Sequence, residues 1–245
     1  MTEFTQTING IRATVTYRDE DVQTIFLPLL RHLSAMQRER GCRIVAFLAA
    51  PPGAGKSTLA AFLEMLSDRE PGLVRLRAVG MDGFHMQQDV LVSHTLQRDG
   101  RTVRMVDIKG APETFELDLF RARLDRLRQG GPCPWPIYDR QKHNPVDGAI
   151  RVTEDLVVVE GNYMLLDRPG WRDLIGFSDY TVRIRADEAL LRERLVQRKL
   201  DTGRTRSEAE AFVDSSDLYN ARTCAAFELP ADLTLTWTGA GFEKA

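Results

Sequence analysis

Residues 43–58, Arg-Ile-Val-Ala-Phe-Leu-Ala-Ala-Pro-Pro-Gly-Ala-Gly-Lys-Ser-Thr, place a short apolar run directly before a glycine-rich loop. An uninterrupted apolar run such as 44–49 is typical of a strand that is buried in a parallel sheet. The loop ends in the Gly-Lys-Ser of a P-loop, and an apolar helix is predicted after it at 58–66. This order of strand, loop and helix predicts a site for the phosphates of ATP or GTP.

The residue types in the loop suit phosphate binding. Glycines let successive backbone N–H groups converge on phosphate oxygens, the Lys56 ammonium reaches the β- and γ-phosphates, and the Ser57 hydroxyl is a ligand for Mg²⁺. Ala50 replaces the first glycine of the G-x-x-x-x-G-K-[ST] pattern, at a position that starts the loop, so we expect its methyl group to be tolerated. The predicted nucleotide-binding residues are Pro52, Gly53, Ala54, Gly55, Lys56, Ser57 and Thr58.

Composition and charge exclude several classes of protein. With 245 residues, the chain is long enough for one α/β domain with insertions, so we expect a single domain over 1–245. The net charge of −2 provides no basic field for nucleic acid or membrane. Three scattered cysteines fit a reducing cytosol and predict neither disulfides nor a cysteine metal site. Because the N-terminus does not resemble a signal peptide and no apolar run approaches about 18 residues, the sequence predicts a cytoplasmic protein.

Predicted strands alternate with predicted helices along the chain. A hairpin is expected at 3–17 around Asn9-Gly10, followed by a helical apolar stripe with a kink at Pro28. Residues 86–112 are polar and irregular, and this length indicates a substrate loop rather than an idle connection. Further strands are predicted at 74–79, 155–160, 180–184 and 233–237, and further helices at 117–127, 190–200 and 207–224. The pattern predicts an α/β protein of the P-loop NTPase fold, with a mostly parallel, doubly wound sheet flanked by helices.

Two acidic residues follow predicted strands at the sheet edge that carries the P-loop. In a P-loop fold, the strand beside the loop strand should end in an acid that handles Mg²⁺, and Glu160 fits this position. Asp82 follows the strand at 74–79, where its carboxylate can accept the proton of an acceptor hydroxyl that attacks the γ-phosphate. Each residue also has a plainer interpretation, Glu160 as a solvated strand-end carboxylate and Asp82 as a turn cap before Gly83.

Missing motifs narrow the class of P-loop protein. A GTPase switch needs an Asn-Lys-x-Asp element that reads the base. The nearest string, Arg198-Lys199-Leu200-Asp201, differs at its first position and lies on a predicted helix. The sequence also lacks the Leu-Ser-Gly-Gly signature of ATP-driven transporters. Among the classes of P-loop protein considered, a kinase that acts on small molecules therefore remains.

Five motifs in register resemble the uridine kinase / phosphoribulokinase / bacterial pantothenate kinase superfamily, over about residues 40–225. They are Ala50–Thr58, Met81-Asp82-Gly83-Phe84-His85, Lys109-Gly110-Ala111-Pro112-Glu113-Thr114-Phe115, Tyr138-Asp139-x-x-x-His143 and Val157-Val158-Val159-Glu160-Gly161-Asn162. Within this superfamily the chain is most similar to the bacterial nucleoside/nucleotide kinase-like, fructose-kinase-like branch. The resemblance implies a kinase that uses ATP and Mg²⁺ on a small hydroxyl-bearing molecule, with Asp82 as catalytic base and with Ser57 and Glu160 at the metal.

The resemblance points to two different kinds of acceptor. Tyr138 and His143 match the Tyr-Asp-x-x-x-His with which uridine kinases hold the nucleoside, whereas the motif at 109–113 is similar to one in bacterial pantothenate kinases. We therefore expect a sugar or nucleoside, with a pantothenate-like acceptor as the alternative. The predicted substrate-binding residues are His85, Lys109, Tyr138, Arg140 and His143. Three of these residues also have an interpretation without substrate contact. Tyr138 would then belong to the core, His143 would be an exposed loop residue, and His85 would be a neighbour of Asp82.

An arginine-rich helix at 190–200 and the polar turn at 201–206 indicate a small helical lid within 186–224. Arg194 and Arg198 are four residues apart and share one helix face. In related kinases such arginines reach the transferring phosphate, so both are candidate catalytic residues beside Lys56 and Asp82. The alternative is a solvated face on which Glu188 and Glu193 pair with the arginines.

Two other functional classes stay open from the sequence. A nucleotide-binding regulator would use ATP occupancy as a switch and would need no base at Asp82. An inert scaffold would not need Lys56, Ser57, Asp82 and Glu160 together. Residues 1–40, the predicted hairpin and helix, lie outside the core resemblance, and the hairpin could pair with a second subunit in a homodimer or serve as an edge within its own chain.

Overall fold

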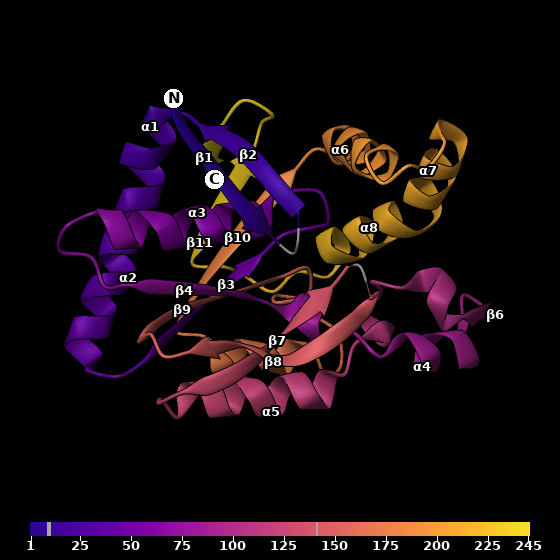
Figure 1. Ribbon diagram of the computed structural model, residues 1–245, viewed down its shortest axis with the longest axis horizontal. Helices are drawn as coiled ribbons and strands as arrows, with labels where there is room; N and C mark the ends of the chain where they lie inside the picture. Colours follow the sequence, from indigo (N-terminus) through magenta and orange to yellow (C-terminus); the bar gives the residue numbers. More distant parts are fainter. Residues whose placement is uncertain (9–10, 141) are drawn as a thin grey trace.

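The computed structural model describes residues 1–8, 11–140 and 142–245, and it describes side chains except at 7–13 and 141. The turn expected at Asn9-Gly10 lies outside the described residues. A six-stranded sheet forms the centre of the molecule (Figure 1), in the order β12 (Phe242–Lys244), β11 (Leu233–Trp237), β10 (Tyr180–Ala186), β3 (Ile44–Ala49), β9 (Leu156–Gly161) and β4 (Leu76–Gly80). Only the β11–β12 pair within this sheet is antiparallel, so the predicted mostly parallel sheet is confirmed.

Both faces of the sheet are covered, which explains the uninterrupted apolar run of β3. Successive side chains of a strand point to opposite faces. Ile44, Ala46 and Leu48 pack into the core beneath α2 (Leu27–Arg40) and α3 (Lys56–Arg69). The alternate residues, beginning with Val45 and Phe47, pack into a second core beneath α5 (Leu117–Arg128), on the opposite side of the sheet (Figure 1).

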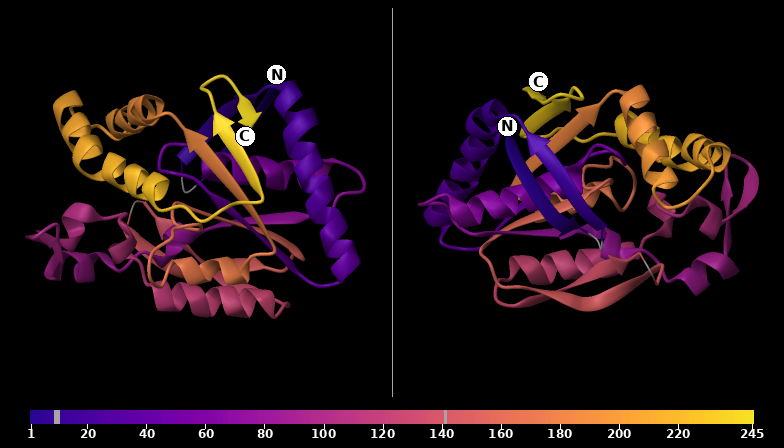
Figure 2. Two further views of the ribbon diagram at one scale, coloured as in Figure 1. Left: turned by 180° about the vertical axis from the view of Figure 1, so that it is seen from behind. Right: turned by 45° about the horizontal axis from the view of Figure 1, so that its top comes forward.

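The N-terminal hairpin joins β1 (Thr2–Ile8) to β2 (Ile11–Tyr17) in a sheet of their own, so the hairpin is confirmed. Phe4 and Tyr17 pack on Phe62 of α3, with ring centres 5.5 and 4.4 Å away. The buried carboxylate of Asp21 accepts hydrogen bonds from Arg18 at 2.6 Å and from the backbone N–H of Phe242 at 3.2 Å. These bonds hold the two ends of the chain close together, as Figure 2 shows from two sides.

Two segments predicted as helices, the first with a kink at Pro28, each contain a π turn. Ahead of α2, the short α1 (Asp19–Asp21) continues into the π turn η1 (Val22–Phe26). Pro28 lies in the first turn of α2, where its missing N–H costs least, so the irregularity precedes the proline. The helix predicted at 207–224 is divided into α7 (Arg206–Phe212), the π turn η6 (Val213–Asp217) and α8 (Leu218–Ala226).

The segment predicted as an irregular loop at 86–112 contains regular structure, so that prediction is wrong in form. It holds α4 (Gln88–Ser93), β5 (Thr95–Arg98), β6 (Arg101–Arg104) and the 3₁₀ turn η3 (Met105–Ile108). We call residues 88–108 the arm. Figure 1 shows it beside α7 and α8. The Arg98 guanidinium stacks 3.7 Å from the centre of the Tyr219 ring, and the Tyr219 hydroxyl lies 3.3 Å from an Asp99 carboxylate oxygen.

The sequence interpretation missed one hairpin close to the catalytic edge. β7 (Cys133–Asp139) and β8 (Asn144–Val152) pair antiparallel over the face that α5 covers. Prolines in both strands, with Gly148 in β8, obscure the alternation that would predict them. The remaining elements are α6 (Glu188–Leu200) and the 3₁₀ turns η2 (Met81–Phe84), η4 (Pro112–Thr114) and η5 (Arg172–Phe177). Within the described part of the chain, no helix combines the length and apolarity that a membrane crossing requires.

Candidate active site

The P-loop connects the end of β3 to the start of α3. Gly53 and Gly55 have φ angles of 85° and 86°, in the left-handed region that disfavours other residues. A Cβ atom at Gly53 would also lie 3.0 Å from Leu195 of α6. No side chain caps the start of α3, so the N–H groups of its first turn can bind phosphate oxygens. Ala50 is buried without a left-handed φ, which agrees with the expectation that its methyl group is tolerated.

Ser57 and Glu160 meet at the centre of the site. β3 pairs directly with β9, and Glu160 stands opposite Leu48 at the carboxyl ends of the two strands. The Ser57 hydroxyl donates a hydrogen bond of 2.8 Å to Glu160 Oε1. The expected position of the acid beside the loop strand is therefore confirmed. Hydroxyl and carboxylate oxygens suit Mg²⁺, which would be held by these two residues together with phosphate oxygens.

Glu160 is only 6% exposed. Burial raises its pKa to about 7, the Lys56 charge opposes this shift, and the nearby Asp82 charge adds to it. A cation bound beside Glu160 would favour the ionised form.

Asp82 lies on η2, the tight turn that follows β4. The turn is fixed from β7: Trp135 donates a hydrogen bond of 2.9 Å to the carbonyl of Gly80, and Gly83 packs against the Pro136 carbonyl with no room for a side chain. Burial acts to raise the Asp82 pKa, but the positive charges around it outweigh burial and lower it; they come from His85, Lys56, Arg140 and Arg198. Asp82 is therefore ionised at neutral pH, as a base must be.

His85 supports the turn rather than the Asp82 carboxylate. Its Nδ1 lies 2.7 Å from the main-chain carbonyl oxygen of Asp82. The imidazole packs between Phe115 and Tyr138, with ring centres 4.1 and 5.1 Å away. Burial lowers the His85 pKa, and the adjacent Asp82 charge opposes this shift.

Lys109, Tyr138 and His143 come together at the tip of the β7–β8 hairpin. Lys109 donates hydrogen bonds to Gln88 Oε1 at 2.6 Å and to the His143 carbonyl at 3.0 Å, and its ammonium lies 4.9 Å from the centre of the Tyr138 ring. His143 itself is exposed and has a positive φ of 53°. Its main chain, rather than its imidazole, makes the contact with Lys109. The exposed Arg140 acts on Asp82 through its charge.

The arginines of α6 divide between two surfaces. Arg194 covers the P-loop, because a Cβ atom at Gly55 would lie 3.3 Å from its Nη2. Arg198 lies 3.9 Å from the Asp217 carboxylate, and its charge helps to lower the Asp82 pKa. Arg192 instead pairs with Asp214 at 2.7 Å.

The alternative interpretation, in which Glu188 and Glu193 pair with the arginines of α6, is wrong for Glu188. Glu188 pairs with Arg222 of α8 at 2.6 Å rather than with an arginine of its own helix. Arg194 and Arg198 thus face the P-loop and Asp82, in agreement with a shared helix face.

Three buried polar residues on η6 and α8 were missed from the sequence. Ser216, Asp217 and Asn220 are at most 9% exposed. Ser216 Oγ and Asn220 Oδ1 have no hydrogen-bond partner within the described residues. A Cβ atom at Gly110 would lie 3.7 Å from Asn220 Nδ2, so α8 borders the Lys109-Gly110 turn. The spacing of polar residues by three and four was the available signal, because it puts them on one helical face.

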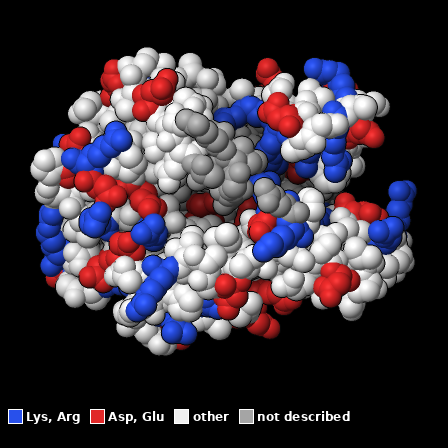
Figure 3. All heavy atoms as spheres, in the orientation of Figure 1, with Lys and Arg blue, Asp and Glu red and all other residues white. Residues whose placement is uncertain are grey.

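A cavity of about 200 Å³ opens beside the P-loop helix. Ser57, Asp82, Tyr138 and Glu160 are among its lining residues, so the predicted metal site and the predicted base face one space. Figure 3 shows the hollow in the middle of the molecular surface, with acidic atoms in its depth and basic side chains on the side of α6.

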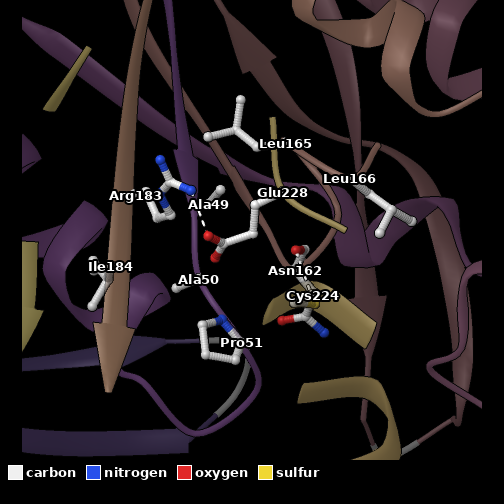
Figure 4. A pocket seen from close by; sticks show the side chains of 10 residues that line it. All are labelled: Ala49, Ala50, Pro51, Asn162, Leu165, Leu166, Arg183, Ile184, Cys224 and Glu228. Atoms are coloured by element: carbon white, nitrogen blue, oxygen red, sulfur yellow. Dashed lines mark hydrogen bonds and ion pairs between the residues drawn. The ribbon is translucent and has the colours of Figure 1, made fainter. Parts of the chain in front are cut away.

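A second, much smaller cavity lies behind the start of the P-loop (Figure 4). Its volume of about 20 Å³ suits roughly one water molecule. Arg183 crosses it to bind Glu228 at 2.5 Å, close to Ala50 and Pro51. The Arg183–Glu228 ion pair lies beside the start of the loop, and the cavity is too small for a nucleotide.

Residues 45–216 match the model of the Phosphoribulokinase / Uridine kinase family. The chain belongs to this family. The predicted family resemblance and the α/β P-loop fold are therefore confirmed. The family consists of P-loop kinases, which use ATP, and Mg²⁺ use is general among them.

Similar proteins cover most of the chain. The uncharacterized protein YggC of Escherichia coli is 40% identical over 96% of this chain and 95% of its own length. A solved structure from Silicibacter sp. TM1040, named a "putative fructose transport system kinase", has 35% identity and a TM-score of 0.71 over 84% of this chain and 98% of that one. A pantothenate kinase of Lactococcus lactis is 25% identical over 73% of this chain and 62% of its own length.

Proposed function

We propose that this protein is an ATP-dependent kinase that transfers the γ-phosphate of ATP to a hydroxyl group of a small metabolite. Sugars and nucleosides are the first candidates for the acceptor. One observation carries the proposal: Ser57, Glu160 and the ionised Asp82 line the same cavity. A base that faces the phosphate-binding loop across an open space suits an acceptor hydroxyl between them.

The chain's own residues divide the work of phosphoryl transfer. The loop residues from Pro52 to Thr58 bind the triphosphate, and Ser57 with Glu160 hold Mg²⁺, which neutralises phosphate charge when bound. Lys56 stabilises charge on the β- and γ-phosphates as the bond to the leaving group breaks. Asp82 takes the proton of the acceptor hydroxyl as its oxygen forms the new bond to phosphorus.

The helices at 186–224 act as a lid within a single kinase domain. Arg194 reaches over Gly55, and Arg198 lies where its charge acts on Asp82. Planar guanidinium groups in these positions suit the oxygens of a transferring phosphate. Closure of the lid excludes water that would otherwise hydrolyse ATP.

The acceptor is held by residues on the side of Asp82 that faces away from the loop. Tyr138 lines the cavity and His85 packs against it, which supports a role in positioning a ring or hydroxyl groups. Arg140 and His143 lie at the tip of the β7–β8 hairpin next to this region, and Lys109 contacts the same tip through the His143 carbonyl. A regulator that only senses ATP would not need the base at Asp82.

The test is ADP release by the full chain against nucleosides, hexoses, pentoses, their phosphates and pantothenate. We expect release that depends on one class of acceptor and is lost in Asp82→Asn. If the chain binds ATP but no acceptor raises ADP release above the basal rate, the kinase proposal fails and a regulatory role takes its place.

A further inference from the structure

The cavity beside Asp82 continues away from the P-loop along the outer edge of β4. Ser57, Asp82 and Glu160 line its catalytic end. Its far end is lined by Gln6 from β1, Glu64 from α3 and Arg77 from β4. The two ends belong to one continuous space, so a molecule that presents a hydroxyl to Asp82 has room to extend beneath the N-terminal hairpin.

We propose that this space is the acceptor subsite, that Gln6 is a specificity-determining residue in it, and that its ligand is an uncharged polyol the size of a pentose or hexose. This inference rests on the proposed kinase function. In this inference one wall of the acceptor subsite is formed by Gln6, which precedes the family match that begins at residue 45.

The hairpin is fixed relative to the catalytic groups through α3. Phe4 and Tyr17 pack on one face of this helix, at Phe62. Ser57 and Glu64 of the same helix line the cavity. Because α-helices are stiff over three or four turns, the hairpin and the P-loop keep a constant spacing across the cavity.

The size and lining of the cavity favour a small polyol. A volume of about 200 Å³ is below the roughly 300 Å³ at which pockets for drug-sized ligands begin. Ile137 and Ile150 offer apolar surface on the β7–β8 side, whereas Gln6, Glu64 and Asp82 offer polar atoms on the others. A sugar has an apolar ring face and a rim of hydroxyl groups, which matches this division.

The charges at the far end of the cavity disfavour anions. Glu64, Asp82 and Glu160 face the space, and Arg77 is the single basic residue among those that line it in the described part of the chain. Arg77 already binds Glu64 and Glu154, each at 2.8 Å. Its charge is thus neutralised by carboxylates, so a phosphate or carboxylate at this far end would meet no unpaired cation among the described lining residues, whereas Lys56, Arg140 and Arg198 act at the catalytic end.

Only some of the residues that the sequence suggested for acceptor binding line the cavity. Tyr138 and Asp82 line it, whereas Lys109 and His143 do not. Lys109 instead uses its ammonium to tie Gln88 to the His143 carbonyl. The pantothenate-like motif therefore has a structural role here, in joining the arm to the β7–β8 hairpin.

The first test uses Gln6→Ala in the full chain, with D-fructose, D-ribose, fructose 6-phosphate and gluconate as acceptor probes. We expect wild-type turnover with a neutral sugar, and at least about a tenfold lower kcat/KM for the anionic probes. In Gln6→Ala the KM for the neutral sugar should rise about three- to tenfold, with the KM for ATP unchanged. The matched control is Thr5→Ala on the opposite face of β1, where Thr5 Oγ1 pairs with Thr14 Oγ1 at 2.8 Å.

The second test fills the cavity with Ala61→Leu, a half-buried position of α3 that lines it. The sugar KM should rise at least about tenfold while the Kd for ATP, measured by calorimetry, stays at the wild-type value. Unchanged sugar KM in Gln6→Ala overturns the subsite, even where Ala61→Leu does not fold. Equal use of gluconate overturns the charge argument. Nucleosides are assayed beside the sugar probes. Turnover with nucleosides alone overturns the inference and leaves the kinase proposal standing, whereas no turnover with any of these acceptors overturns both.

Discussion

The two halves of the active cleft are built in different ways. The phosphate half comes from one continuous stretch that consists of β3, the P-loop and α3. Glu160 of the neighbouring strand β9 completes it, with its Oε1 atom 2.8 Å from the Ser57 hydroxyl. The proposed acceptor half comes from β1, η2 and β7, which are far apart in the chain and line one cavity. A triphosphate is the same in every kinase of this kind, so a local motif suffices. An acceptor differs from one kinase to another, and a wall made of separate segments can change one segment at a time.

The largest effect should come from the phosphate half. Lys56→Ala removes the cation from the β- and γ-phosphates when their charge redistributes, so we expect kcat to fall by about 10³-fold. ADP release and circular dichroism melting should be measured together. A folded variant with near wild-type turnover would show that the loop does not serve phosphoryl transfer.

Asp82→Asn tests the boundary between the halves. The Kd for Mg-ATP should stay nearly constant while kcat falls about 10²–10⁴-fold, because the base acts on the acceptor hydroxyl. If ATP binding collapses instead and added Mg²⁺ restores it, Asp82 is a metal ligand and belongs to the phosphate half.

Arg198 and Arg192 form a matched pair on α6. Arg198→Ala should lower kcat about 10- to 100-fold with little change in the KM for ATP, since its contacts would form mainly in the transition state. Arg192→Ala removes only the ion pair with Asp214 and should change kcat less than about twofold.

Hydrogen exchange across 192–206, with and without an ATP analogue and acceptor, measures lid closure directly. We expect slower exchange with both ligands bound. Equal exchange in both states, together with equal kinetics of the two arginine variants, would assign Arg198 to a solvated surface.

Asn220→Leu tests whether the buried Asn220 amide serves acceptor binding or only the fold. It removes a buried amide oxygen without a partner, so the unfolding free energy without ligands should rise by about 1 kcal/mol. The kcat/KM for the acceptor should fall about tenfold, because α8 belongs to the proposed lid, whose closure would bring the amide beside the Lys109-Gly110 turn toward the cavity. Ser215→Ala is the control, since the Ser215 hydroxyl is exposed and bonds to the Ala211 carbonyl. Lower stability together with unchanged acceptor kinetics would make Asn220 a purely structural residue.

The smallest effect is one of stability, at the ion pair behind the acceptor cavity. Burial alone would raise the Glu154 pKa, but hydrogen bonds from Arg77 and the backbone lower it from 4.5 to about 2. The ionised form therefore stabilises the fold above pH 4.5, and this contribution disappears as the pH falls through about 2. Glu154→Gln should cost about 1 kcal/mol at pH 7, and urea unfolding should show the gap to wild type closing below pH 4.5. A gap that is constant with pH would mean that packing, not charge, is responsible.

The phosphate half could be predicted because its information is local. A buried parallel strand has an apolar pattern, left-handed loop positions require Gly53 and Gly55, and Glu160 follows from the strand order of the fold. Asp82 was predictable because it follows a strand at the same sheet edge. The irregular loop assigned to 86–112 was wrong, because short polar helices and strands have no apolar pattern of their own. They are ordered by neighbours, as Arg98 is by Tyr219.

The sequence by itself determined the sheet, the P-loop and the family, because backbone geometry and burial restrict which residue types can occupy a position. It also predicted Asp82 as the base. Only the tertiary structure brought Gln6 into the cavity beside Asp82 and set Asn220 beside the Lys109-Gly110 turn. It also tied Lys109 to the His143 carbonyl and separated Arg198 from Arg192. These outcomes depend on which distant segments meet. Packing across the two cores decides which distant segments meet, and this cannot be predicted from single residue types.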